Sequence, residues 1–522
     1  MGAHSYEDPA ADSGTDSGTD AGADHGASAE RLNTLTSWHS DWSGLRVAVL
    51  GLGMTGFAAA DTLAELGSDV LVVAGRAPDE RARLLEVLGV PLVTADLDVA
   101  PDALVAHNPE LIIVSPGFHP DHPLLVWAEA QAIPVWGDIE LAWRLRDKVG
   151  PAAPWILVTG TNGKTTTVQL AATMLAAGGH RVAPCGNIGV PVLDAIRDPQ
   201  GWDVLVVELS SYQLHHLPLT GPGALVPWSS VCLNVADDHL DWHGSADAYA
   251  AAKGRVYQNT RVACVYNLAD DATRRMVEEA DVVDGCRAIG FGLGAPGPSD
   301  VGVVDGIIVD RAFHEDRRNA ALELTTHGEL AAAGLAAPHS VANVLAASAL
   351  ARAFGVAPET VRDALATFRL DHHRTETVAE GDGVLWVDDS KATNPHAAEA
   401  SLRAYPSVVW VVGGLLKGVD VDELVARQAQ RLTAAVIIGV DRTALREAFQ
   451  RHAPALPVFE VEPTDTKEVM PEAVRLSAAA ARPGDTVLLA PAAASMDQFT
   501  DYADRGRRFA AAVRDQLEAR ND

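Results

Sequence analysis

A glycine-rich turn between an apolar strand and an Ala/Leu-rich helix constrains the fold of this chain more than any other feature. The strand WILVTG runs directly into Gly160-Thr161-Asn162-Gly163-Lys164-Thr165-Thr166. Such glycines let backbone N–H groups point at phosphate oxygens, while Lys164 can neutralise phosphate charge and the Thr165 hydroxyl can bind Mg²⁺. Val158 stands where the usual P-loop pattern has its first glycine, so the loop is short. We therefore predict a phosphate-binding P-loop in an α/β domain.

Apolar strands and helical stretches alternate along most of the chain, whose 522 residues suffice for roughly three domains. Before the linker at 150–154, strands are predicted within 46–50, 70–75 and 110–117; later ones fall within 203–207, 229–235, 384–390, 408–414, 434–440 and 485–491. This order favours three consecutive α/β domains: a Rossmann-like N-terminal domain, a central P-loop ATPase domain and a Rossmann-like C-terminal domain. We expect them at 41–149, 150–375 and 376–522, after a disordered acidic tail at 1–40.

The charge and cysteine content exclude several classes of protein. Acidic residues outnumber basic ones by 70 to 40, a formal net charge of −30, which disfavours general binding to nucleic acid. No stretch approaches the ~20 apolar residues that span a bilayer, and no secretory signal is visible. Four cysteines without CxxC spacing indicate neither a zinc site nor a disulfide framework. We expect a cytoplasmic monomer whose partners are small molecules, with no role for nucleic acid or membrane.

Acidic and histidine side chains follow two further strands of the second domain. The strand at 203–207 leads into Glu208, at the sheet edge where α/β proteins bind ligands, and a carboxylate there can hold the Mg²⁺ of ATP. The next strand leads into NVADDHLDWH, which contains Asp238 and His239, and Lys253 follows on a predicted helix. Imidazole and carboxylate groups can bind a second divalent cation in this loop.

The first domain contains a second glycine turn, GLGMTG, with glycines at 51, 53 and 56. A nucleotide pyrophosphate can bind to such a strand-to-helix turn, and the pattern also occurs in NAD-dependent oxidoreductases. The next strand, however, ends in Ala74-Gly75-Arg76 and lacks the acidic residue that binds the ribose of NAD. Arg76 suits an anionic or differently bound nucleotide.

Three loops of the third domain follow predicted strands. They contain DDSKATN at 388–394, Lys417 after Gly413-Gly414, and Ser495 in PAAASMDQF. Because the carboxyl ends of parallel strands lie at one edge of a sheet, these loops can converge. Two lysines and several hydroxyl groups at one edge of the sheet suit the binding of a small acidic substrate.

Taken in order, these motifs resemble those of a known family, the Mur ligases. The chain contains GLGMTG, SPG, GDIEL, GTNGKTTT, GNIG, ELSSYQL, NVADDHLD, AAK, DDSKATN, GGLLKG and PAAASMDQF. DDSKATN with PAAASMDQF resembles the D-glutamate-adding branch, the MurD type. The resemblance extends from about Leu45 to the C-terminal helix. It implies an ATP-dependent amide ligase that adds D-glutamate to UDP-N-acetylmuramoyl-L-alanine through an acyl phosphate, in peptidoglycan precursor synthesis.

The resemblance also implies roles for individual residues. ATP would contact Gly160, Thr161, Asn162, Gly163, Lys164, Thr165, Thr166, Asn343, Arg374 and Asp389. Two Mg²⁺ sites would involve Thr165, Glu208, His239 and Lys253, the last as a carbamate, and the catalytic residues would be Lys164, His239 and Lys253. The UDP-substrate would contact Thr55, Arg76, Asn187, Ser210 and Gln213. D-glutamate would contact Lys391, Thr393, Lys417, Ser495 and Tyr502.

Three alternatives stay open at this point. One is another amino-acid specificity within the Mur ligases, or a folylpolyglutamate synthase, which shares the P-loop but does not explain the GLGMTG domain. The second is the NAD-dependent oxidoreductase considered above. The third is a nucleotide-binding switch without catalytic activity, which the presence of Lys164, Glu208, His239 and Lys253 together disfavours.

Overall fold

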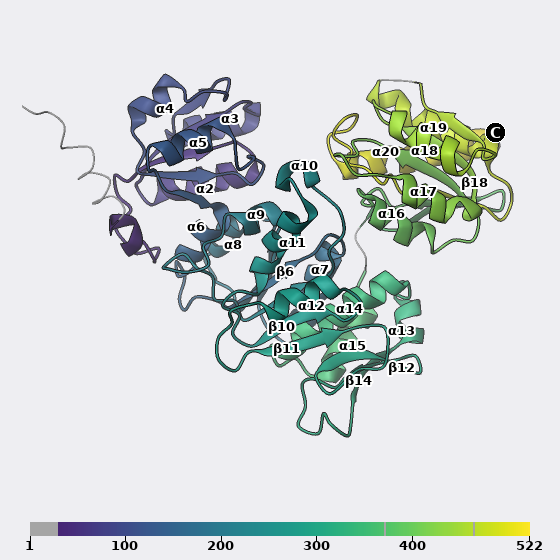
Figure 1. The fold of residues 1–522 in the computed structure, drawn as a ribbon, viewed down its shortest axis with the longest axis horizontal. Coiled ribbons are helices and arrows are strands. Elements are labelled where there is room, and N and C mark those ends of the chain that lie inside the picture. The colour runs from purple at the N-terminus through teal and green to yellow at the C-terminus, as the bar shows by residue number, and fades with distance from the viewer. Residues whose placement is uncertain (1–29, 370–371, 463–464, 522) are drawn as a thin grey trace, which may run out of the picture. The chain divides into compact units, whose positions relative to one another are not determined.

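A computed structural model describes residues 30–369, 372–462 and 465–521. The acidic tail predicted to be disordered at 1–40 lies outside these ranges up to residue 29. For its last part the prediction was wrong, because Leu32 and Leu35 are buried. The described residues form three β-sheets in succession along the chain, each flanked by helices (Figure 1). Within the described residues, the part up to Gly150, together with Thr220–Gly223, makes one compact unit, and the rest makes a second unit that contains two of the sheets. The predicted series of α/β sheets is therefore confirmed.

The first sheet has five parallel strands in the order β3-β2-β1-β4-β5. Alternate side chains of its central strands, such as Leu50 and Val114, pack against Leu124 of a covering helix. The strands are β1 (Arg46–Leu50), β2 (Asp69–Ala74), β3 (Leu92–Thr94), β4 (Leu111–Val114) and β5 (Val135–Gly137). The helices are α2 (Met54–Glu65), α3 (Asp79–Leu88), α4 (Asp102–His107), α5 (Pro123–Ala130) and α6 (Asp138–Arg144).

The second sheet has nine strands in the order β14-β13-β12-β11-β10-β9-β6-β8-β7. They are β6 (Trp155–Thr159), β7 (Val182–Gly186), β8 (Val204–Glu208), β9 (Ser229–Cys232), β10 (Ala263–Asn267), β11 (Arg287–Phe291), β12 (Asp300–Val304), β13 (Ile307–Asp310) and β14 (Leu322–Thr326). The predicted strands at 155–160, 203–207 and 229–235 correspond to β6, β8 and β9. The antiparallel pairs β12–β13 and β13–β14 at one edge were not anticipated from the sequence.

The helices of this second domain cover the sheet and supply its core. Apolar residues of α7 and α14, such as Leu170, Leu175 and Leu345, share one buried cluster with strand residues Val158 and Val206. The helices are α7 (Lys164–Ala177), α8 (Val192–Ile196), α9 (Ser211–His215), α10 (Leu240–His243), α11 (Ala246–Gly254), η1 (Arg255–Tyr257), α12 (Asp271–Glu278), α13 (His327–Ala332), α14 (Pro338–Ala353) and α15 (Pro358–Thr367). Most residues of α7 and α14 are buried, which explains why neither helix has a distinct polar face.

The third sheet has six strands in the order β15-β16-β20-β17-β18-β19, with only the β15–β16 pair antiparallel among the described strands. They are β15 (Glu376–Gly381), β16 (Val384–Asp388), β17 (Val408–Gly413), β18 (Leu432–Ile438), β19 (Val458–Glu460) and β20 (Thr486–Leu489). Both faces are buried, because Val409 and Val411 of β17 lie in one core cluster while Val408, Trp410 and Val412 lie in another. Its near-continuous apolar strands are typical of such a doubly covered sheet.

Helices from different parts of the chain cover these two faces. α19 (Thr466–Ala480) and α20 (Tyr502–Asn521) contribute to one cluster, and α16 (Pro395–Leu402), α17 (Asp422–Gln428) and α18 (Thr443–His452) contribute to the other. The short η2 (Ala429–Arg431) links α17 to β18. Across the described residues, no helix combines the length and apolar character needed to cross a membrane.

Candidate active site

The predicted phosphate loop joins β6 to α7, with Lys164 as the first residue of the helix. Gly163 has a φ of 85°, and a Cβ there would lie 2.3 Å from Oδ1 of Asn343, so the turn requires glycine. Asn234, which follows β9, fixes the loop: it accepts a hydrogen bond from the backbone N–H of Asn162 (2.9 Å) and donates one to the Asn162 carbonyl (3.1 Å). Asn234 therefore holds the P-loop in shape, while Asn343 lies close against its Gly163.

Two lysine side chains converge on this loop. Nζ of Lys164 donates to the carbonyl oxygens of Gly160 (2.8 Å) and Thr161 (2.9 Å), and Nζ of Lys253 donates to the same Gly160 oxygen at 2.9 Å. Lys253 comes from α11, is only 2% exposed, and lies 4.7 Å from the ring centroid of Tyr249. Together the two ammonium groups make a local cationic site in a chain whose net charge is −30.

Burial lowers the pKa of both lysines. It is the main cause that lowers the pKa of Lys253 to about 7, and repulsion by Lys164 adds to it. Burial also lowers the pKa of Lys164, against the attraction of Glu208 and Asp238. Near neutral pH a substantial fraction of Lys253 is therefore a free amine, which can act as a nucleophile.

Glu208 and Thr165 provide oxygen atoms next to the two lysines. Glu208 ends β8, is 2% exposed, and accepts a hydrogen bond on Oε1 from the Asn187 side chain at 3.0 Å. Within the described residues its other oxygen, Oε2, is buried without a hydrogen-bond partner. Thr165, also buried, follows Lys164. A carboxylate oxygen in need of a partner and a hydroxyl fit a Mg²⁺ ion, which prefers oxygen ligands.

His239 lies in the loop between β9 and α10, with a φ of 54°. Its Nδ1 lies 2.5 Å from the Tyr212 hydroxyl, and its Nε2 lies 3.6 Å from Oδ2 of Asp238. Burial is the main cause that lowers the pKa of His239 to about 4, although Asp238 opposes this. The imidazole is therefore neutral at physiological pH, the form that can bind a metal ion.

The residues predicted to bind the rest of ATP come from separate elements. Asn343 lies on α14 against Gly163. In the sequence, Arg374 comes shortly before β15 and Asp389 comes directly after β16. Asp389 is buried, accepts a hydrogen bond from the backbone N–H of Thr375 at 3.2 Å and another from the Ser401 hydroxyl. Burial raises the pKa of Asp389 to about 6.

The three loops at the third sheet lie together, as expected from their position after parallel strands. Leu415 and Ala494 exchange backbone hydrogen bonds of 2.9 and 3.0 Å, which brings the Lys417 loop beside the Ser495 loop. The backbone N–H of Ala492 donates to the carbonyl of Ala392 at 3.0 Å. The DDSKATN loop, which also contains Thr393, therefore lies next to the Ser495 loop. Nζ of Lys391 lies 3.7 Å from the ring centroid of Tyr502.

Sequence reasoning missed Arg505, a fully buried arginine of α20 that fixes these loops. Its guanidinium donates to the carbonyl of Ser390 (2.8 Å), to the Ser390 hydroxyl (3.0 Å) and to the carbonyl of Ala493 (3.1 Å). Nothing in the polar sequence around it distinguishes Arg505 from its exposed neighbours. Asn394 was predicted as part of a motif but without its contact: its Nδ2 donates to Oδ1 of Asn162 in the phosphate loop at 3.0 Å.

The five residues predicted for the UDP-substrate fall into both compact units. Thr55 lies on the first turn of α2 and Arg76 is exposed directly after β2. In the other unit, Asn187 contacts Glu208, and Ser210 and Gln213 form the capping box that starts α9. The last three side chains therefore also have a local structural role.

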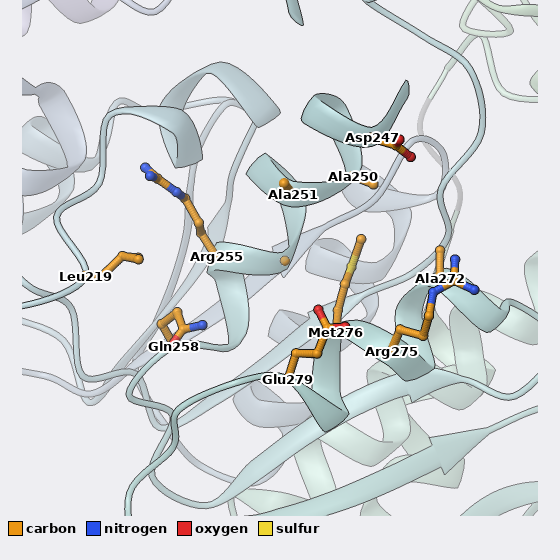
Figure 2. Close-up of a pocket in the computed structure, with 11 residues that line it drawn as sticks. Leu219, Asp247, Ala250, Ala251, Arg255, Gln258, Ala272, Arg275, Met276 and Glu279 are labelled. Atoms are coloured by element: carbon orange, nitrogen blue, oxygen red, sulfur yellow. The ribbon is translucent and has the colours of Figure 1, made fainter. Parts of the chain in front are cut away.

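A separate cavity lies between α11, η1 and α12. It has a volume of about 420 Å³ and is lined by eleven residues from α11, η1, α12 and the nearby chain, among them Ala251, Arg275 and Met276 (Figure 2). None of these eleven residues belongs to the predicted site.

Comparisons with known proteins agree with the geometry. The family descriptions that match are the Mur ligase MurD-like N-terminal domain at residues 45–137, the Mur ligase middle domain at 158–351 and the Mur ligase glutamate ligase domain at 373–493. A UDP-N-acetylmuramoylalanine–D-glutamate ligase of Leifsonia xyli subsp. xyli is 70% identical over 498 residues, which cover 94% of this chain and 96% of that protein. The chain belongs to the Mur ligase family.

Further relatives extend this result. A UDP-N-acetylmuramoylalanine–D-glutamate ligase of Streptomyces avermitilis is 55% identical over 480 residues, covering 91% of this Mur ligase and 99% of the relative. Among solved structures, a UDP-N-acetylmuramate–alanine ligase of Thermotoga maritima matches with a TM-score of 0.54 at 20% identity, over 90% of this chain and 99% of that one. At such an identity the structural likeness shows the fold alone, and it agrees with the three-sheet architecture of this Mur ligase.

Proposed function

We propose that this Mur ligase joins the amino group of D-glutamate to the alanyl carboxylate of UDP-N-acetylmuramoyl-L-alanine and converts ATP to ADP and phosphate. One observation supports phosphoryl transfer from ATP as the first step of this reaction. Lys164 and Lys253 both donate hydrogen bonds to the Gly160 carbonyl, and Glu208 is buried in the same domain. The high identity to relatives named as D-glutamate ligases supports the choice of amino acid.

The chemistry explains why ATP is needed. A carboxylate is a poor electrophile, so the alanyl carboxylate first attacks the γ-phosphorus of ATP and ADP leaves, which gives an acyl phosphate. The amine of D-glutamate then attacks the acyl carbon, and phosphate leaves from the tetrahedral intermediate. Lys164 and the backbone N–H groups of the loop stabilise negative charge on the transferring phosphoryl group.

We assign the metal ligands and catalytic groups as the sequence predicts. Thr165 and Glu208 would hold one Mg²⁺, and His239 with Lys253 as a carbamate would hold or orient a second. When bound, Mg²⁺ offsets the phosphate charge that Lys164 alone cannot. The low pKa of Lys253 supports the carbamate, because only the free amine reacts with CO₂.

The remaining residues are assigned to substrates. ATP would contact Asn343 through its base, and Arg374 and Asp389 through its phosphates and ribose. The UDP-substrate would contact Thr55, Arg76, Asn187, Ser210 and Gln213, and D-glutamate would contact Lys391, Thr393, Lys417, Ser495 and Tyr502. The domains at 41–149, 150–375 and 376–522 would bind the UDP moiety, ATP and the amino acid respectively, in a cytoplasmic monomer.

A substrate panel tests this proposal. Phosphate release by the purified full-length protein should require UDP-N-acetylmuramoyl-L-alanine, Mg²⁺-ATP and D-glutamate together. Turnover with meso-diaminopimelate, or with a folate and L-glutamate, in the absence of any turnover with D-glutamate would refute it. L-glutamate in place of D-glutamate is the matched control for the stereochemistry of the amino-acid site.

A further inference from the structure

The two ring nitrogens of His239 have different neighbours: Tyr212 lies next to Nδ1, and Asp238 lies nearer to Nε2. The hydroxyl oxygen of Tyr212 lies 2.5 Å from Nδ1, which is a short hydrogen bond, whereas Oδ2 of Asp238 lies 3.6 Å from Nε2. Tyr212 is four residues beyond Glu208, so the same strand end supplies a carboxylate to the proposed metal site and a hydroxyl to His239.

The surroundings hold Tyr212 in this position. Its ring stacks on the buried Trp242, with centroids 4.4 Å apart and an angle of 27° between the planes. Nε2 of His243 lies 2.9 Å from the Ser211 hydroxyl, which joins α10 to α9 next to this stack. The capping box of Ser210 and Gln213 fixes the start of α9. The hydroxyl is therefore placed by packing and not by its bond to His239 alone.

Two proton arrangements satisfy the contact between Tyr212 and His239. In the first, Nδ1–H donates to the tyrosine oxygen, and Nε2 has a free lone pair. In the second, the tyrosine O–H donates to Nδ1, and Nε2 carries a proton that needs an acceptor. The Asp238 oxygen beside it is 3.6 Å away, beyond hydrogen-bond length, which favours the first arrangement.

We propose that Tyr212 is a positioning residue for His239: its hydroxyl oxygen accepts the Nδ1–H proton and keeps the lone pair on Nε2, beside Asp238, for a divalent cation. This inference rests on the proposed function, in which His239 helps to hold the second Mg²⁺. Partners of metal-binding histidines commonly fix the tautomer in this way.

The tautomer of His239 in the wild-type protein tests the proposal without any substitution. Long-range ¹H–¹⁵N correlation spectra of the full-length protein, without substrates or metal, distinguish a nitrogen with a proton from one with a lone pair. We expect the proton on Nδ1. A proton on Nε2 would overturn the proposal. This readout does not depend on which amino acid the enzyme adds, so it separates the present inference from the proposed function.

Tyr212→Phe keeps the ring that stacks on Trp242 and removes the hydroxyl. We expect the dissociation constant for Mn²⁺, measured by electron paramagnetic resonance without substrates, to rise on the order of 10-fold. The Mg²⁺ concentration for half-maximal phosphate release should rise similarly, while kcat at saturating Mg²⁺ stays near the wild-type value. Tyr266→Phe, which removes a hydroxyl from β10 of the same domain, serves as the control. A Tyr212→Phe protein with wild-type metal constants would contradict the proposal.

Discussion

Two glycine turns of this chain each start a helix directly after a parallel strand, and they differ at the first helical residue. α2 begins at Met54 with Gly53 as its N-cap, whereas α7 begins at Lys164 with Gly163 as its N-cap, and threonine follows in both. Met54 is 61% exposed, but Nζ of Lys164 is folded onto two loop carbonyls. The first turn also has a cation on its backbone, because Nη1 of Arg81 donates to the Leu52 carbonyl at 3.4 Å. Of these two turns, however, the second is the one whose cation comes from the first helical residue itself.

This difference between the turns corresponds to two tasks, because transferring a phosphoryl group needs more groups than binding a phosphate. A glycine turn at a helix N-terminus offers N–H groups and a partial positive charge to any phosphate. Phosphoryl transfer also needs groups that stabilise charge as it develops, and around the second turn these would be Lys164 and the Mg²⁺ ions whose proposed ligands include Lys253 as a carbamate. In the proposed function the GLGMTG turn would only hold a substrate, so an exposed methionine is acceptable there.

The largest effect is expected from Lys164→Ala. Loss of the ammonium group should lower kcat on the order of 10³-fold, because the transferring phosphoryl group loses a preorganised positive charge. Phosphate release under saturating substrates measures this effect. Met54→Ala, at the equivalent position of the first turn, is the matched control and should leave kcat unchanged. Equal effects of the two substitutions would remove the distinction between the turns.

Lys253→Ala should lower kcat on the order of 10²-fold if the carbamate orients Mg²⁺ as proposed. Short carboxylates such as acetate should restore part of the activity, because they can occupy the place of the carbamate. Lys467→Ala, an exposed lysine of α19, is the control and should respond to neither treatment. Absence of any rescue would count against the carbamate but not against the ligase assignment.

The carbamate should also depend on pH. With a pKa of about 7 for Lys253, the free amine predominates above that pH and the unreactive ammonium group below it. In protein equilibrated with ¹³C-bicarbonate, the carbamate signal should therefore decrease as the pH falls through about 7. A signal that stays constant through this range would contradict the assignment.

Arg76→Ala tests the first turn and should have a smaller effect. We expect KM for the UDP-substrate to rise about 10-fold, equivalent to about 1.4 kcal/mol, with kcat unchanged, because the lost interaction serves binding alone. Steady-state kinetics with varied UDP-substrate measure both constants. A fall in kcat with constant KM would place Arg76 in the chemical step and break the comparison between the turns.

Met54→Lys is expected to have the smallest effect. It gives α2 the same first residue as α7, yet the exposed position has no second lysine and no buried carboxylate comparable to Glu208 in its turn. Phosphate release without the UDP-substrate should remain at the background of the wild-type protein. A new ATPase activity would mean that a glycine turn and one lysine are sufficient.

The sequence predicted those features that depend on local pattern. Apolar runs located β1, β6, β8 and β16, and the glycine turns followed from their position between strand and helix. Convergence of the three loops at the third sheet followed from the rule that parallel strands share a carboxyl edge. The antiparallel strands β12 to β14 were missed although a signal was present: Asp305-Gly306, both with positive φ, form the two-residue hairpin turn between β12 and β13.

Contacts between residues distant in sequence could not be predicted. Arg505 bonds to Ser390, 115 positions away, and Tyr212 bonds to His239, 27 positions away; both contacts depend on how strands and helices pack. The lowered pKa of Lys253 likewise follows from burial beside Lys164, which neither residue's own sequence neighbourhood reveals. Local patterns therefore predicted the candidate groups, while packing determines their burial and orientation.

The most direct test of the central claim is to identify the product by mass spectrometry. The purified protein, incubated with UDP-N-acetylmuramoyl-L-alanine, Mg²⁺-ATP and D-glutamate, should convert the UDP-substrate to a species heavier by one glutamyl residue, with one ADP formed per product. Lys164→Ala should form almost none of it. Release of phosphate without this mass increase, or an increase that corresponds to a different amino acid in a mixture that contains D-glutamate, would contradict the account.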